Sequence, residues 1–205
     1  MQQEFYHTIE KPAVTEYKDR GSKFIAYAFP VATVDDFKVK LNELKKEHPK
    51  ATHHCYAYRI GLNGDNFRVS DAGEPSGSAG KSILGQLDSK QLTNTLVVVV
   101  RYFGGTLLGV PGLINAYKSV TALVLQLTPL LEKPVEAIYR LRFDYTQIND
   151  VMNIIKQCNC TIYEQQMQLF SEFKIGVAVS RRQEVLYRLK EIRDLEIINQ
   201  DKQNN

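Results

Sequence analysis

Two glycine-rich segments contain the residues best suited to chemistry. The first, Gly73-Glu-Pro-Ser-Gly-Ser-Ala-Gly-Lys-Ser82, ends like a phosphate-binding loop. The full pattern needs a glycine five residues before the Gly-Lys-Ser, and Pro75 occupies that position. Ser78 and Lys81 also fit a Ser-x-x-Lys hydrolase motif, but the companion motifs of that class are missing. Nucleotide hydrolysis is therefore not expected here.

Two interpretations of this first segment remain open. It is either a turn followed by a capped helix, or a helix N-terminus that binds a phosphate. In the second case free N–H groups at the helix start and the neighbouring Lys81 would attract the anion.

The second segment is Arg101-Tyr-Phe-Gly-Gly-Thr-Leu-Leu-Gly-Val-Pro-Gly112, in which a buried strand ends in glycines that open a helix. It lacks the Gly-x-Gly-x-x-Gly spacing of dinucleotide-binding folds. Glycine lets the backbone approach a ligand or another backbone closely, and the sequence is compatible with both uses. We predict that the two segments form one concave anion site, with two separate structural turns as the alternative.

His53-His-Cys55 raises the question of a metal site. On a strand, His53 and Cys55 share one face and His54 points away, which leaves two ligands and no local third. We therefore expect neither a metal nor a cofactor. Nearby aromatic residues could stack on bases, although strand aromatics usually belong to the core; they are Tyr56, Tyr58, Tyr102 and Phe103.

Charge and cysteine content limit the possible partners and compartments. Residues 1–130 carry 15 Lys and Arg against 12 Asp and Glu, whereas residues 131–205 carry 11 of each kind. A polyanion should therefore meet the first part. The chain has three cysteines, no basic-then-apolar leader pattern at its start, and no apolar run long enough to cross a bilayer. We expect reduced thiols, no membrane partner and a cytoplasmic location.

The elements expected around these segments begin with a hairpin over residues 14–31 that turns at Asp19-Arg-Gly-Ser22. A helix N-capped by Thr33 follows. Strands are expected over residues 53–60 and 95–103, and the second has the β-branched pattern of a strand buried on both faces. Helices are expected over residues 81–87 and after Pro111.

Beyond residue 130 the pattern changes. Thr128-Pro129 and Lys133-Pro134 indicate a linker, so we place an N-terminal domain at residues 1–131 and a C-terminal domain at residues 135–200. The second domain has the element order βαββαβ, which is typical of a ferredoxin-like domain. We thus predict a two-domain α+β protein.

Three long blocks carry a specific resemblance. They are Ala51-Thr-His-His-Cys-Tyr-Ala-Tyr-Arg-Ile-Gly61, Ser70-Asp-Ala-Gly-Glu-Pro-Ser-Gly-Ser-Ala-Gly-Lys81 and Val97-Val-Val-Val-Arg-Tyr-Phe-Gly-Gly105. In sequence and order they resemble the bacterial YigZ and eukaryotic IMPACT family. The match covers the N-terminal domain firmly, and the tail looks like the domain that bacterial members append.

The resemblance implies an N-terminal fold like the second domain of a small-subunit ribosomal protein and a C-terminal domain like the last domain of elongation factor G. It also implies a role in regulating translation, since eukaryotic relatives dampen a stress-response kinase pathway. The family commonly has Lys at the position of Leu107 and Arg at that of Asn115. This chain lacks both positive charges beside its second glycine segment.

We therefore expect a translation-associated regulatory protein that binds RNA or the ribosome, with a translation-factor protein as another possible partner. Arg59, Arg68, Lys81 and Arg101 would contact phosphate, Gly104 and Gly105 would allow close approach, and His53 and Tyr56 would lie at the rim. For Arg101 the alternative is a pair with a buried carboxylate such as Asp71 or Glu74, which would only hold the end of its strand. Two alternatives stay open. One is a protein-interaction adaptor without nucleic-acid binding, and the other is a hydrolase that uses Asp71, Glu74, Ser76 and Lys81.

Overall fold

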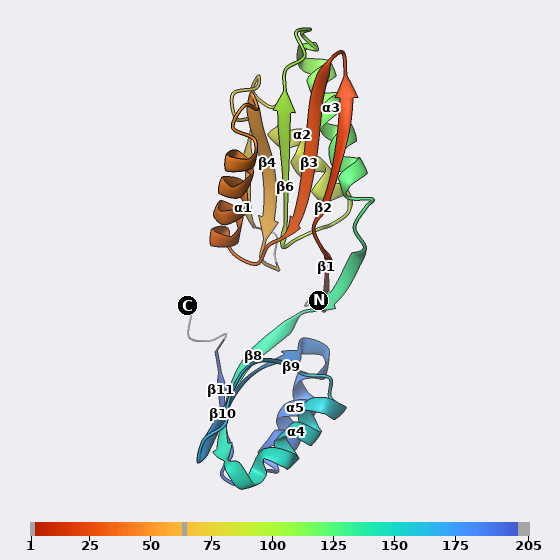
Figure 1. Cartoon of the computed structure of the whole chain (residues 1–205). Coiled ribbons are helices and arrows are strands. Elements are labelled where there is room, and N and C mark those ends of the chain that lie inside the picture. Colours follow the sequence, from red (N-terminus) through yellow and green to blue (C-terminus); the bar gives the residue numbers. More distant parts are fainter. Residues whose placement is uncertain (1–2, 63–64, 201–205) are drawn as a thin grey trace. The chain divides into compact units, whose positions relative to one another are not determined.

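The chain divides into two compact units. The N-terminal unit comprises residues 6–133, and the C-terminal unit comprises residues 134–205 together with residues 1–5. The structure, a computed structural model, describes residues 3–62 and 65–200. Each unit has its own sheet and its own helices (Figure 1). This mixture of sheets and helices confirms the predicted α+β class.

The N-terminal unit is built on a five-stranded antiparallel sheet. Its strand order is β2-β3-β6-β4-β5, so the β-branched strand β6 lies at the centre. Seven of the eight residues of β6 are buried, as expected for a strand covered on both faces. The strands are β2 (Ala13–Asp19), β3 (Ser22–Pro30), β4 (His53–Ile60), β5 (Asn66–Ser70) and β6 (Thr95–Tyr102).

The predicted hairpin forms between β2 and β3. Asp19 pairs with Ser22, and the two residues between them, Arg20 and Gly21, have φ angles of 45° and 81°. Two successive positive φ angles are what a two-residue hairpin turn requires. The turn therefore brings the first residues of β3 back beside the end of β2.

Helices cover both faces of this sheet (Figure 1). Helix α1 (Val34–Glu47) packs on one face and begins with the predicted cap, because Thr33 accepts a hydrogen bond from the Asp36 amide. The Asp36 carboxylate in turn accepts from the Thr33 amide, which completes a capping box. Helices α2 (Gly80–Ser89) and α3 (Gly109–Val124) pack on the other face.

Strand alternation divides the buried residues of β4 and β6 between two cores. One core lies between the sheet and helices α2 and α3. It contains Tyr117 together with Cys55, Ala57, Val97 and Val99. Residues of the opposite parity face α1, and they include Tyr56, Tyr58, Leu96, Val98 and Val100. Burial of each large side chain stabilises the fold by about 1.5–3 kcal/mol.

The segment expected to be a linker contains a strand. Residues Leu130–Pro134 form strand β7, which pairs with strand β1 (Phe5–Ile9) in a two-stranded sheet. Neither strand was predicted from the sequence. A strand rather than an open connection therefore runs up to the boundary at Lys133 and Pro134.

The C-terminal unit has the predicted βαββαβ order of elements. Its sheet order is β11-β8-β10-β9, and all three pairings are antiparallel. A short 3-10 turn precedes each helix, at Tyr145–Gln147 and at Val179–Arg181. The main elements are β8 (Glu136–Asp144), α4 (Ile148–Gln157), β9 (Thr161–Gln166), β10 (Phe170–Ala178), α5 (Arg182–Lys190) and β11 (Glu196–Asn199).

Within the described part of the chain, none of the helices combines the length and the apolar character needed to cross a membrane.

Candidate binding pocket

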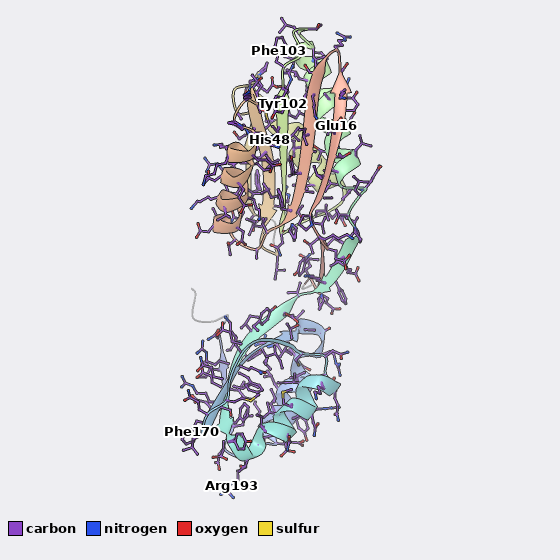
Figure 2. All side chains as sticks on the ribbon, in the orientation of Figure 1. Glu16, His48, Tyr102, Phe103, Phe170 and Arg193 are labelled. Carbon is purple, nitrogen blue, oxygen red and sulfur yellow. The ribbon has the colours of Figure 1, made fainter. Side chains whose placement is uncertain are left out.

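Both glycine-rich segments contribute to one pocket in the N-terminal unit. The pocket has a volume of about 390 Å³. Its walls are mostly apolar, and its polar residues are Thr52, His53, Glu74 and Arg101. The apolar lining residues are Pro75, Phe103, Leu107, Leu108, Val110 and Leu113, with Gly109 between them. Figure 2 shows Phe103 at the end of the sheet where β6 stops.

A buried ion pair forms the floor of this pocket. Arg101 Nη1 donates to Glu74 Oε1 at 2.6 Å, and the side chains of the two residues are only 5% and 3% exposed. The hydroxyl of Tyr117 donates to the same oxygen at 2.8 Å. The guanidinium also lies over the rings of Phe24 and Phe103. Charge and hydrogen bonding therefore offset the cost of burying Glu74.

His53 lies beside this pair. Strand register places His53 of β4 directly opposite Arg101 of β6. Its Nδ1 donates to the carbonyl oxygen of Ala72 at 2.9 Å, and its Nε2 lies 3.8 Å from Glu74 Oε1. The Nδ1 contact orients the ring, so Nε2 is the nitrogen directed toward the ion pair.

Cys55 is bound into the same network below the floor. Its thiol lies 3.2 Å from the Tyr117 hydroxyl and 3.0 Å from the Asp71 carbonyl oxygen, to which it donates. Burial raises the pKa of Cys55 to about 12, and burial also raises the pKa of Tyr117. Both groups stay protonated at neutral pH, so neither is a nucleophile here.

The glycines of the second segment serve close packing of the backbone. A Cβ on Gly104 would lie 1.9 Å from the carbonyl carbon of Gly21, in the β2–β3 turn. The hydroxyl of Ser22 accepts from the Gly104 amide and from Arg101 Nη2. Of the two uses of glycine left open by the sequence, Gly104 thus serves an approach to another backbone. Gly105, with φ of 86°, has open space around its Cβ direction.

The start of α2 already holds an anion of its own. The carboxylate of Asp71 accepts hydrogen bonds from the amides of Gly77, Ala79 and Gly80 at 2.8–3.0 Å. Burial opposes ionisation of Asp71, but these amides and the charge of Lys81 outweigh it and lower the pKa of the carboxyl group. The interpretation of this helix start as a phosphate site is corrected, because Asp71 occupies it.

The other predicted cations lie away from the pocket. Arg59 donates to Asp88 at 2.6 Å and lies over the Phe67 ring. Arg68, on the edge strand β5, and Lys81, in the first turn of α2, are exposed. Arg101 is buried, so its positive charge does not lie on the surface. The phosphate contact that the sequence suggested for Arg101 is therefore not available at the surface.

Two further predicted residues are also outside the pocket lining. Ser76 is exposed in the loop before α2. Tyr56, expected at the rim, lies on the opposite face of the sheet and packs its ring 4.9 Å from that of Phe37. That placement is corrected by strand parity, since His53 and Tyr56 are three residues apart on β4 and face opposite sides.

Sequence reasoning missed Tyr117, Ser22 and the apolar walls of the pocket. From the sequence, Tyr117 is only one of several residues at helical spacing in the helix expected after Pro111. A hydroxyl within such a stripe indicates a buried hydrogen-bond partner, and this signal could have pointed to Glu74. The Ser22 contact had no local signal, because its partner Arg101 lies 79 residues away.

Fold and site together define a two-unit α+β protein with an apolar pocket over a buried ion pair. Residues 20–125 match the family model described as the Impact N-terminal domain. The chain therefore belongs to the IMPACT family, which confirms the resemblance seen in the three sequence blocks.

Relatives match over most of both chains. An IMPACT family member of Haemophilus influenzae is 34% identical over 175 residues, which cover 84% of this chain and 85% of that protein. YigZ of Escherichia coli is 32% identical over 173 residues, which cover 83% and 84%. A crystal structure of a hypothetical protein is 28% identical, covers 97% of this chain and 98% of its own, and has a TM-score of 0.75.

Proposed function

We propose that this chain is a translation-associated regulatory protein that binds a protein component of the translation apparatus through its pocket. Membership of the IMPACT family supports the link to translation. The likeness of the two units to domains of a ribosomal protein and of elongation factor G, implied by the resemblance, belongs to the same proposal. A cytoplasmic location would follow from this role.

The observation that carries the proposal is the apolar rim of the pocket. Leu107 is 82% exposed, Phe103 47% and Val110 45%, and all three line the pocket. Exposed apolar side chains grouped around a cavity are typical of a protein-binding surface. The resemblance implies a lysine at the position of Leu107, so the rim is more apolar here than the resemblance alone would suggest.

RNA binding is a second candidate, supported by the exposed cations Arg68 and Lys81. The buried Arg101 and the Asp88-paired Arg59 are poor phosphate contacts. Two contacts rather than four would give a slope of log K against log salt of about −1.4 for a single strand. Charge alone therefore supports only weak binding to RNA.

The two candidates can be separated by cosedimentation with purified ribosomes and with protein-free ribosomal RNA, over about 50–200 mM salt. We expect ribosome binding with a shallow salt dependence, reduced about tenfold or more by Leu107→Glu. Val39→Glu is the matched control, because Val39 is 54% exposed on α1, on the other face of the sheet.

Binding to protein-free RNA that is lost in the double variant Arg68→Ala/Lys81→Ala, but unchanged in Leu107→Glu, would replace the protein-binding proposal with the RNA candidate. An absence of binding to both ribosomes and RNA would refute the proposed role.

A further inference from the structure

The N-termini of α2 and α3 differ in how their positive ends are neutralised. At α2 the Asp71 carboxylate accepts three amide hydrogen bonds. At α3 the N-cap is Leu108, whose side chain is apolar, and the first turn Gly109-Val-Pro-Gly112 has no acidic residue. The helix start carries partial positive charge, and Leu108, Gly109 and Val110 line the pocket. The pocket therefore contains a helix start without a counter-charge of its own.

Arg101, on the pocket floor, has one N–H group without a hydrogen-bond acceptor in the described part of the chain. Arg101 bonds to Glu74 through Nη1 and to Ser22 through Nη2. Its Nε is buried and finds no hydrogen-bond partner within residues 3–62 and 65–200. Buried N–H groups are almost always paired in folded proteins, so an acceptor supplied by a ligand would complete the set.

Glu74 does not exclude an anion from this place. Its Oε1 accepts from Arg101 and from Tyr117, so its charge is already compensated within the floor. His53 adds an imidazole nitrogen, Nε2, 3.8 Å from the same oxygen. The floor thus combines one carboxylate with one guanidinium, one imidazole and the positive end of a helix.

The apolar walls indicate what kind of molecule would carry an anionic group into this pocket. Phe103, Leu108 and Leu113 present apolar surface above the floor, and the volume of about 390 Å³ lies in the range of small-ligand pockets. A hydrated phosphate on a flexible chain gains little from such walls. A carboxylate attached directly to an apolar body matches both the floor and the walls.

We infer that the pocket receives the free C-terminus of a polypeptide that ends in a large apolar residue. The terminal carboxylate is held by the start of α3 and by Arg101, and the last side chain packs against Phe103, Leu108 and Leu113. This inference rests on the proposed function, in which the partner is a protein, and it names the part of the partner that enters the pocket.

The test uses a short acetylated peptide that ends in leucine, as the free acid and as the C-terminal amide. Titration calorimetry with the full chain should show that the amide binds at least about tenfold more weakly, the loss expected for one charge-assisted hydrogen bond. Equal affinity of the two peptides, or binding of neither, would overturn the inference.

Substitution of Val110 tests the helix start without disturbing the core, because this residue is exposed. Val110→Asp places a carboxylate in the first turn of α3, where it would supply the negative charge that the Asp71 carboxylate supplies at the start of α2. It should abolish the preference for the free acid without lowering the melting temperature. Val110→Asn removes the same apolar contact without the charge and should keep the preference, as should Ile114→Asp one turn further along the helix.

Phenyl phosphate serves as the probe for a different anion. Binding of phenyl phosphate as tight as that of the free-acid peptide would assign the site to phosphates and overturn the C-terminal carboxylate. The proposed function is tested separately by the ribosome experiment. If Leu107→Glu abolishes ribosome binding while both peptides bind equally, the inference fails and the proposed function stands.

Discussion

The charges of Arg101 and Glu74 are both buried, so each needs the other to remain stable in the folded protein. The ion pair has side chains only 5% and 3% exposed, and strand and loop bring them together across 27 positions of sequence. We predict that Arg101→Ala lowers the free energy of unfolding by about 3–5 kcal/mol, because it leaves the Glu74 carboxylate buried without its cation. Urea unfolding monitored by circular dichroism measures this loss.

A paired substitution separates charge from packing at the same position. The double variant Arg101→Met/Glu74→Gln should recover part of the stability lost in Arg101→Ala, since it leaves no unpaired charge. If the double variant is less stable than Arg101→Ala alone, packing of the guanidinium on Phe24 and Phe103 outweighs the ion pair.

Asp71 makes the stability of the N-terminal unit depend on pH. Its pKa is lowered in the folded chain, so the stabilisation is complete above the ordinary carboxyl pKa and is lost as pH falls through the folded value. We predict that Asp71→Asn costs about 1 kcal/mol at neutral pH. The difference between the two proteins should shrink below about pH 4. Thermal unfolding of both proteins across that range checks the sign, and a difference that widens in acid would contradict it.

At the scale of elements, the contact between Gly104 and the β2–β3 turn allows the sharpest prediction. Gly104→Ala places a Cβ 1.9 Å from Gly21, where only backbone could move, and should cost about 3 kcal/mol or more. Gly105→Ala meets open space but has a positive φ, and should cost roughly 1–2 kcal/mol. Gly85→Ala, within α2 and also in open space, should stabilise by about 0.5–1 kcal/mol.

Melting temperatures of these three alanine variants provide the measurement. The predicted order is Gly85→Ala above the parent chain, then Gly105→Ala, then Gly104→Ala. A Gly104→Ala protein as stable as Gly105→Ala would show that the turn can move away from the loop.

Elements with strong local signals could be predicted from the sequence. The Thr33 cap, the Arg20–Gly21 turn and the β-branched strand β6 each depend on neighbouring residues, and all three are present. Strands β1 and β7 could not be predicted, because each consists of five residues and their partners lie over 120 positions apart. Their pairing depends on tertiary structure rather than on local propensity.

The candidate site was only partly predictable for the same reason. Both glycine segments were expected to form one concave site, and both line the pocket. For Arg101 the sequence leaves two uses open, a phosphate contact and a pair with a buried carboxylate such as Asp71 or Glu74, and the structure shows the pair with Glu74. The sequence could not choose between them, because the two residues lie 27 positions apart. Likewise, Asp71 was considered as a catalytic acid, because the sequence does not show that the amides of residues 77–80 would fold back onto it.

At the scale of the whole molecule, the chain crosses between its two units twice. Residues 1–5 belong with residues 134–205, and residues 6–133 form the other unit. The Val135 amide donates to the Glu4 carbonyl oxygen within the C-terminal unit. A cut between Lys133 and Pro134 therefore leaves residues 1–5 as a second connection.

We predict that a protease site inserted between Lys133 and Pro134 can be cleaved while the two fragments still elute together from a sizing column. Removal of residues 1–5 before cleavage should release two folded fragments, because each unit has its own core. Circular dichroism of the separated fragments tests whether each unit folds alone, as the two-domain prediction requires. Separation of the fragments while residues 1–5 are present would contradict the second connection.

Because the chain crosses between its units twice, the order of its segments determines when each unit is complete during synthesis. If the C-terminus is joined to the N-terminus by a flexible linker and new ends are opened between Lys133 and Pro134, the permuted chain runs 134–205, then 1–5, then 6–133. Each unit is then a single uninterrupted stretch of polypeptide. A ribosome making the permuted chain would complete one unit before starting the other. In the natural order, the first unit begun is the last to be finished.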